Sequence, residues 1–255
     1  MLDVLAVLTA ANVLNNRVAP RLAPLTSAAA TGALVALARR KGLSWERMGF
    51  AHGRRGALAG AALTAAVAAG YAVAVAHPRL RPLLHDDRAL RLSRARLAEE
   101  ILLQVPVGTV LLEEVGFRGV VYGLVERGHG HRVATAVSSG LFGLWHILPA
   151  LDMLRANPAV AALAAQASGA PAGTESFTAA GPAPSVRRAA GTVPGAVAGA
   201  VAGAVAGTVA ATAGAGVLFC TLRRRFGLIV PAMLHTATNA LGYVAARAAR
   251  RLRRP

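Results

Sequence analysis

The chain has 255 residues, of which 55% are hydrophobic and 15% are charged, and its formal net charge is +17. A soluble domain usually carries about a quarter charged residues. Here the charges are bunched between long apolar runs, which argues against an ordinary soluble domain and is typical of a chain solvated by lipid.

The excess of basic residues and the single cysteine limit the kinds of binding partner that the chain is expected to have. A basic chain can bind nucleic acid, but the sequence has no zinc-finger spacing, no helix-turn-helix pattern and no basic patch interleaved with aromatics, so we expect no nucleic-acid partner. Arginines in basic loops that contact anionic lipid explain the charge more simply. Cys220 is the single cysteine, which excludes an intrachain disulfide, and we expect no disulfide partner.

Apolar stretches predicted to be helical lie along the chain at about 2–15, 22–38, 56–76, 101–125, 133–151, 193–221 and 228–246. A run of about 20 apolar residues is long enough to cross the hydrocarbon core of a bilayer. The first two stretches are short and form either two tilted spans or one helical hairpin, which gives about six or seven spans in all. Basic loops flank both ends of the third stretch, so the positive-inside rule does not fix the orientation.

Two segments of biased composition follow one another in the second half of the chain. Residues 166–192 are rich in Ala, Gly, Pro, Ser and Thr and are predicted to form a flexible loop. The next helix contains an AVAG repeat, which places glycines at Gly195, Gly199, Gly203 and Gly207. In lipid this spacing makes a flat face for close helix packing. The alternative is a low-complexity expansion without a specific partner, and both interpretations stay open.

Two adjacent carboxylates, Glu113 and Glu114, lie near the middle of the 101–125 stretch, in LLEEVGFRG. Ionisable groups are costly in the hydrocarbon region, so the pair needs partners, a metal ion or a water-filled cavity. Glu114 and Arg118 are four residues apart on one helix face and are predicted to form an ion pair. Glu113 points about 100° away and is the better candidate for a general base. The alternative is a buried ion pair plus one protonated acid.

Two histidines lie in later apolar stretches, His146 in LFGLWHILP and His235 in PAMLHTATNALG. Phe142 precedes His146 by four residues and Asn239 follows His235 by four, so each pair shares a helix face. Imidazole can ligate Zn²⁺ or polarise a carbonyl, and asparagine offers a neutral donor to an oxyanion. The two histidines and a carboxylate would complete an open zinc site, although no HExxH motif is present. The alternative for each histidine is a satisfied core residue.

Three motifs therefore follow one another on three apolar stretches, and they are Glu113-Glu114-x-x-x-Arg118, Phe142-x-x-x-His146 and His235-x-x-x-Asn239. In this order they resemble the CPBP family, the CAAX-prenyl-protease and bacteriocin-processing intramembrane proteases. The resemblance covers about 95–246, and the earlier stretch LSWERMGF is similar to a family loop. The long 166–192 insertion between the second and third motifs departs from the family pattern.

The resemblance implies an all-α, polytopic transmembrane helical bundle of about 6–8 spans. Residues 1–92 would form N-terminal membrane helices and basic loops, and residues 93–255 a protease-like helical core with the flexible insertion 166–192. The resemblance also implies a catalytic site, in which Glu113 would activate water, made of Glu113, Glu114, Arg118, His146, His235 and Asn239. His146 and His235 would be the metal ligands if the cofactor Zn²⁺ is bound.

The predicted function is an intramembrane endopeptidase, expected to be a metalloprotease, that cleaves a peptide or protein substrate in or near a bacterial plasma membrane. A prenylated C-terminus, a bacteriocin leader and a transmembrane signalling protein all stay open as substrates. Two other classes of protein fit the same residues, a non-enzymatic immunity or scaffold protein on the same bundle and a proton-coupled transporter. The sequence shows no matching halves, which disfavours the transporter.

Overall fold

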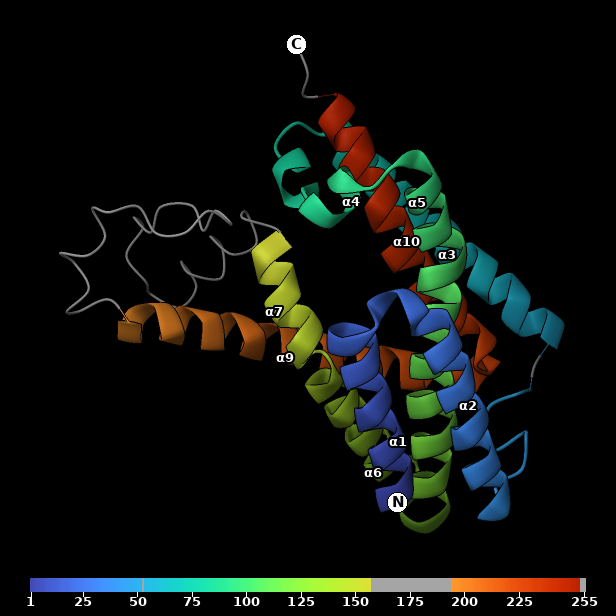
Figure 1. Ribbon diagram of the computed structural model, residues 1–255. Helices are drawn as coiled ribbons and strands as arrows, with labels where there is room; N and C mark the ends of the chain where they lie inside the picture. The colour runs from blue at the N-terminus through green and yellow to red at the C-terminus, as the bar shows by residue number, and fades with distance from the viewer. Residues whose placement is uncertain (52, 157–193, 253–255) are drawn as a thin grey trace.

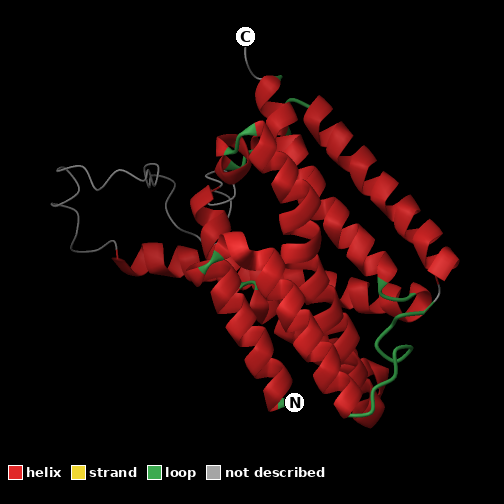
Figure 2. Cartoon of the chain, turned by 45° about the vertical axis from the view of Figure 1, so that its right-hand side comes forward, coloured by secondary structure: helices red, strands yellow, loops and turns green. Residues whose placement is uncertain are grey.

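The computed structural model describes residues 1–51, 53–156 and 194–252, and these form helices and connecting loops without a strand (Figure 1, Figure 2). The longer helices are α1 (Leu2–Val13), α2 (Ala23–Arg40), α3 (Gly53–Ala76), α6 (Tyr122–Trp145), α7 (Ile147–Ala156), α9 (Pro194–Phe226) and α10 (Ile229–Arg251). The shorter ones are η1 (Leu14–Val18), η2 (Pro20–Leu22), η3 (Arg81–Leu84), α4 (Asp87–Arg91) and α5 (Arg94–Glu99). The predicted all-α bundle is confirmed. The insertion at 166–192 lies outside the described residues.

A wide helix leads from α5 into α6 and carries the acidic pair. It consists of two π-helical segments, η4 (Glu100–Leu111) and η5 (Glu114–Val121). Pro106, which cannot donate a helix hydrogen bond, lies inside η4. π-Helical turns are rare and often lie at functional sites. Glu113 and Glu114 thus lie where the two π segments meet.

The chain reverses direction inside α6. Gly130 has φ 76° and ψ 172° between helical residues on either side, a left-handed φ that residues with a Cβ rarely adopt. After this turn the second part of α6 runs back beside η5, where the Ser138 hydroxyl donates to the Phe117 carbonyl at 2.9 Å. The reversal makes the 101–125 and 133–151 stretches, which the sequence predicts as separate helices, run antiparallel.

The main apolar cluster lies between α1, α2, η5 and α6. It includes Leu8, Leu34, Phe117, Phe142 and Trp145, all nearly fully buried. Between helices in lipid, close packing and hydrogen bonds replace the hydrophobic effect as the source of association. One such bond joins the Ser27 hydroxyl of α2 to the carbonyl of Gly108 in η4. The two N-terminal helices therefore support the helix that carries the acidic pair.

Helices α9 and α10 close the bundle. Helix α9 packs chiefly on α6 and also contacts α7 (Figure 1), while α10 packs along α3 (Figure 2). A Cβ on Gly143 would lie 2.7 Å from the Val209 carbonyl oxygen, so α6 and α9 approach closely here. At Gly199 and Gly207 of the AVAG repeat, by contrast, a Cβ would meet no described atom within 4 Å. The close helix contact is made after the repeat.

Three helical segments are long and apolar enough to cross a membrane: Pro20–Arg40, Gly53–Ala76 and Val201–Phe226. The count rises to four if Arg94–Trp145 and Ile147–Leu154, which meet at a bend of 40°, are taken as one broken span. Both counts rest on the length and composition of the described residues. All the predicted apolar stretches fall on helices wherever the chain is described.

Candidate active site

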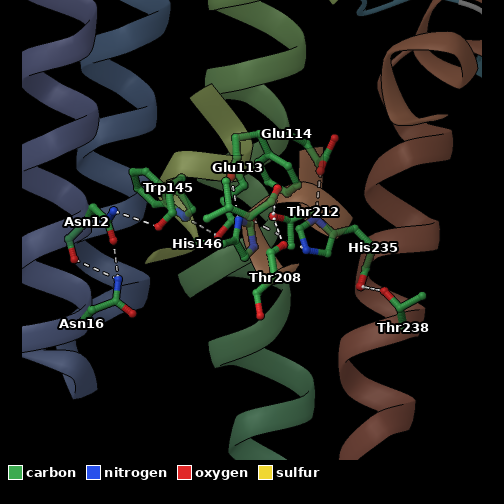
Figure 3. A network of polar contacts seen from close by, with 12 residues as sticks. Asn12, Asn16, Glu113, Glu114, Trp145, His146, Thr208, Thr212, His235 and Thr238 are labelled. Atoms are coloured by element: carbon green, nitrogen blue, oxygen red, sulfur yellow. Dashed lines mark hydrogen bonds and ion pairs between the residues drawn. The ribbon is translucent and has the colours of Figure 1, made fainter. Parts of the chain in front are cut away.

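Three segments distant in sequence bring the predicted catalytic residues together. Glu113 and Glu114 lie on the wide helix. His146 directly follows the last residue of α6, and His235 lies in the second turn of α10 (Figure 3). Glu113 is 4% exposed and Glu114 1% exposed, so both carboxylates are buried. Such burial requires partners for each charge.

Glu114 has two cationic or polar partners on one oxygen. Its Oε1 accepts from Nη1 of Arg118 at 3.2 Å, which confirms the ion pair predicted from the spacing of four residues. The same oxygen accepts from Nδ1 of His235 at 2.8 Å. A carboxylate oxygen can only accept, so the hydrogen lies on Nδ1 of His235. Glu114 therefore compensates the charge of Arg118 and determines the tautomer of His235.

Glu113 has a different environment. Its Oε1 accepts a hydrogen bond from the indole Nε1 of Trp145 at 2.8 Å. Its Oε2 is buried and has no hydrogen-bond partner among the described residues. Oε2 instead lies 4.0 Å from Nε2 of His146 and 3.8 Å from Nε2 of His235. The unpaired oxygen thus faces both imidazoles.

The two imidazoles turn their Nε2 atoms toward Glu113. Nδ1 of His146 donates to the Phe142 carbonyl at 2.8 Å, just as Nδ1 of His235 donates to Glu114. In the neutral form each ring then has a lone pair on Nε2. Three hydrogen-bond acceptors, Oε2 of Glu113 and the two Nε2 atoms, therefore converge. With both rings neutral, a donor such as water would satisfy these three lone pairs, which cannot satisfy one another.

Arg118 is fully buried between aromatic rings. Its guanidinium carbon lies 3.7 Å from the ring centroid of Phe142 and 4.9 Å from that of Phe219. Cation–π contacts of this kind are worth up to about 2 kcal/mol when desolvated. Phe142 also meets the ring of His146 edge-on, with 4.5 Å between centroids. Phe142 therefore contacts residues of both the first and the second motif.

Asn239 lies one turn beyond His235 on α10 and is half buried. It makes no hydrogen bond or ion pair within the described part of the chain. Its amide is therefore available to another group, and its catalytic role stays a prediction.

The donor atoms of the predicted zinc site can be compared with what a metal ion requires. A zinc ion needs three protein ligands at about 2.0–2.2 Å, with a fourth position for water. Within the described residues, no group of three or more His, Cys, Asp or Glu side chains could hold a metal ion. His146 and His235 do face one carboxylate, but as they stand the three do not form a coordination site. Zinc binding stays a prediction.

Two site residues were not predicted from the sequence. Trp145 precedes His146 and binds Glu113, and Phe219 on α9 stacks on Arg118 and lies 5.4 Å from the ring of His235. Both look like ordinary apolar residues of a membrane helix. The only available signal was that Trp145, one of two tryptophans, lies inside the second motif.

Comparison with known families identifies a family to which the chain is similar. The family model described as Rce1-like, type II CAAX prenyl endopeptidase Rce1-like, matches residues 100–241. The match spans more than half of the chain and contains all six predicted catalytic residues. No curated protein and no solved structure matches the chain.

Proposed function

Starting from the premise that this chain belongs to the type II CAAX prenyl endopeptidase Rce1-like family, and is thus an integral membrane endopeptidase, we propose that Glu113 activates the water that attacks the peptide bond. The observation that carries the proposal is the convergence of Oε2 of Glu113 with the Nε2 atoms of His146 and His235. A water placed there donates one hydrogen to the carboxylate and the other to an imidazole. Its oxygen lone pairs then point away from these acceptors, toward the substrate.

In the proposed hydrolysis, Glu113 takes a proton from the attacking water and later gives it to the leaving amine. As the water oxygen forms a bond with the peptide carbonyl carbon, its proton moves to Oε2 of Glu113. When the carbon–nitrogen bond breaks, the same proton passes to the leaving amine, and the products are a carboxylic acid and an amine. The amide of Asn239, which has no partner in the described chain, serves as a donor to the oxyanion.

Glu114 and Arg118 act on this step indirectly. Glu114 holds His235 with its hydrogen on Nδ1, so that Nε2 faces the water. Arg118 balances the charge of Glu114 in a place without solvent. The site then keeps one uncompensated carboxylate, Glu113, and this is the group that accepts the proton.

We also propose that the substrate carries a lipid near the scissile bond. An apolar cavity of about 490 Å³ lies between α3, η4 and α10, and its lining includes Thr64, Pro106, Leu111, Met233 and Ala237. Leu111 is two residues before Glu113, and Ala237 is two after His235, so the cavity is lined by the same two helical segments that lead to the site residues. A prenyl chain suits such an apolar lining. This favours a prenylated C-terminus over an unmodified bacteriocin leader.

The proposal is tested with purified protein in lipid vesicles and a farnesylated peptide ending in a CAAX sequence. Wild-type protein is expected to cleave it faster than the same peptide without the farnesyl group. Glu113→Gln should reduce the rate at least about a hundredfold, the low end for loss of a general base, and leave folding unchanged. Glu46→Gln, an exposed glutamate, is the matched control and should retain full activity.

Three results would count against parts of this proposal. Full activity of Glu113→Gln would exclude the base role. Equal cleavage of both peptides would exclude the lipid preference. A wild-type protein without cleavage of any peptide, whose biological effect survives Glu113→Gln, would favour the immunity or scaffold alternative.

A further inference from the structure

Trp145 makes the one hydrogen bond that the described residues give to Glu113. The indole nitrogen donates to Oε1 at 2.8 Å, while Oε2 has no hydrogen-bond partner. Rotation about the last bond of a glutamate side chain is soft and roughly two-fold. Without the indole, the carboxylate would not have a fixed oxygen facing the imidazoles. The hydrogen bond therefore fixes the plane of the carboxylate, and with it the direction in which the free oxygen points.

The indole is itself held from two sides. It is 7% exposed and meets the ring of Phe117 edge-on, with 5.4 Å between centroids. The side-chain amide of Asn12, on α1, donates to the Trp145 carbonyl at 3.1 Å (Figure 3). That carbonyl lies at the end of α6, where helix carbonyls lack an internal partner. A packed ring and an anchored backbone leave the indole nitrogen little freedom.

Trp145 and His146 reach the two oxygens of one carboxylate from consecutive positions. Successive residues on a helix point about 100° apart. The α-helix ends at Trp145, and His146 has φ −84° and ψ 5°. This change of direction lets the indole contact Oε1 while the imidazole faces Oε2.

We propose that Trp145 is a positioning residue, which holds the carboxylate of Glu113 so that its free oxygen faces His146 and His235. The proposal rests on the proposed function of Glu113 as base. The second motif would then both supply the imidazole of His146 and orient the carboxylate of Glu113 through Trp145. Asn12 transmits the support of the N-terminal helix α1 to the same carboxylate through Trp145.

The contact is tested without any substrate. The chain has two tryptophans, and Trp45, which is 51% exposed, packs on Phe50 away from Trp145. Trp45→Phe therefore leaves a single indole N–H resonance in ¹⁵N-tryptophan-labelled protein. Glu113→Gln should move that proton resonance upfield and speed its exchange with D₂O, and Glu46→Gln should do neither. A resonance that Glu113→Gln leaves unmoved would overturn the proposal.

Kinetics with the farnesylated peptide then separates positioning from packing. Trp145→Phe, which keeps a ring against Phe117, should lower kcat at least about tenfold, as for one hydrogen bond to a charged group, with KM unchanged and the protein still folded at the assay temperature. The isosteric benzothienylalanine at position 145, which lacks only the N–H, should give the same loss. Trp45→Phe should behave as wild type. Unchanged kcat in both Trp145 variants would overturn the proposal. A wild-type protein that leaves the peptide intact would refute the proposed function, and the indole resonance would still decide the contact.

Discussion

Replacing Glu114 by glutamine should destabilise the protein, whereas replacing Glu113 should not. Arg118 is 0% exposed, and its pairing with Glu114 at 3.2 Å is its only ion pair in the described chain. Nε and Nη2 of Arg118 already lack hydrogen-bond partners. Glu114→Gln would leave a buried charge uncompensated, at a cost of about 3–5 kcal/mol in the free energy of unfolding. The stacking on Phe142, worth up to about 2 kcal/mol, does not replace the lost charge.

A second substitution distinguishes charge from packing. Arg118→Met in the Glu114→Gln background removes the orphaned charge and should restore part of the stability. Activity should remain low, because His235 has lost its charged hydrogen-bond acceptor. The assay is reversible unfolding in mixed micelles together with peptide cleavage. If Glu114→Gln unfolds like wild type, or if Arg118→Met recovers nothing, the reasoning fails. If Glu113→Gln misfolds while Glu114→Gln folds but is inactive, the two roles are reversed.

Three further predictions address the membrane, the packing and the metal. The chain should resist extraction by carbonate and high salt and require detergent, because its helices include apolar segments long enough to span a bilayer; release by carbonate would refute this. Gly143→Leu should lower the thermal stability, since a Cβ there meets the Val209 carbonyl oxygen at 2.7 Å, whereas Gly199→Leu, with no described atom within 4 Å, should not; equal stability of the two variants would contradict the close approach of α6 and α9. If zinc is bound as the sequence predicts, elemental mass spectrometry should find about one zinc per chain, lost in the His146→Ala/His235→Ala variant; full activity of metal-free protein would point to a mechanism with glutamate alone.

The helices were predictable because the apolar runs are long and the reversals are marked by glycine and charge. The wide π-helical backbone of η4 and η5 was not predictable, since residues four apart still share a face in such a helix and the periodicity hardly changes. The pairing of Glu114 with Arg118 was predicted correctly for this reason. Local spacing alone was sufficient there.

Contacts between segments that are distant in sequence could not be predicted from residue spacing along one helix. The indole of Trp145 meets Glu113 across 32 positions, and Phe219 reaches Arg118 from a different helix. Without the fold, neither side chain differs from any other apolar residue of a membrane helix. His146 and His235 were selected because ionisable residues in apolar stretches are rare, and the structure does bring both to Glu113.

The arrangement also explains why two adjacent glutamates can differ in role. Adjacent residues on a helix face different neighbours. Here Glu114 faces a cation and a hydrogen-bond donor, whereas the free oxygen of Glu113 faces imidazole nitrogens. Glu114 faces a guanidinium and an N–H donor on a single oxygen, so its charge is compensated. Each glutamate has one buried oxygen without a hydrogen-bond donor among the described residues, but only that of Glu113 faces the Nε2 atoms of two imidazoles, and no cation compensates its charge. A buried acceptor without a donor is costly, and a bound water removes that cost. The same deficit that makes Glu113 expensive to bury therefore gives it affinity for the water that it would activate.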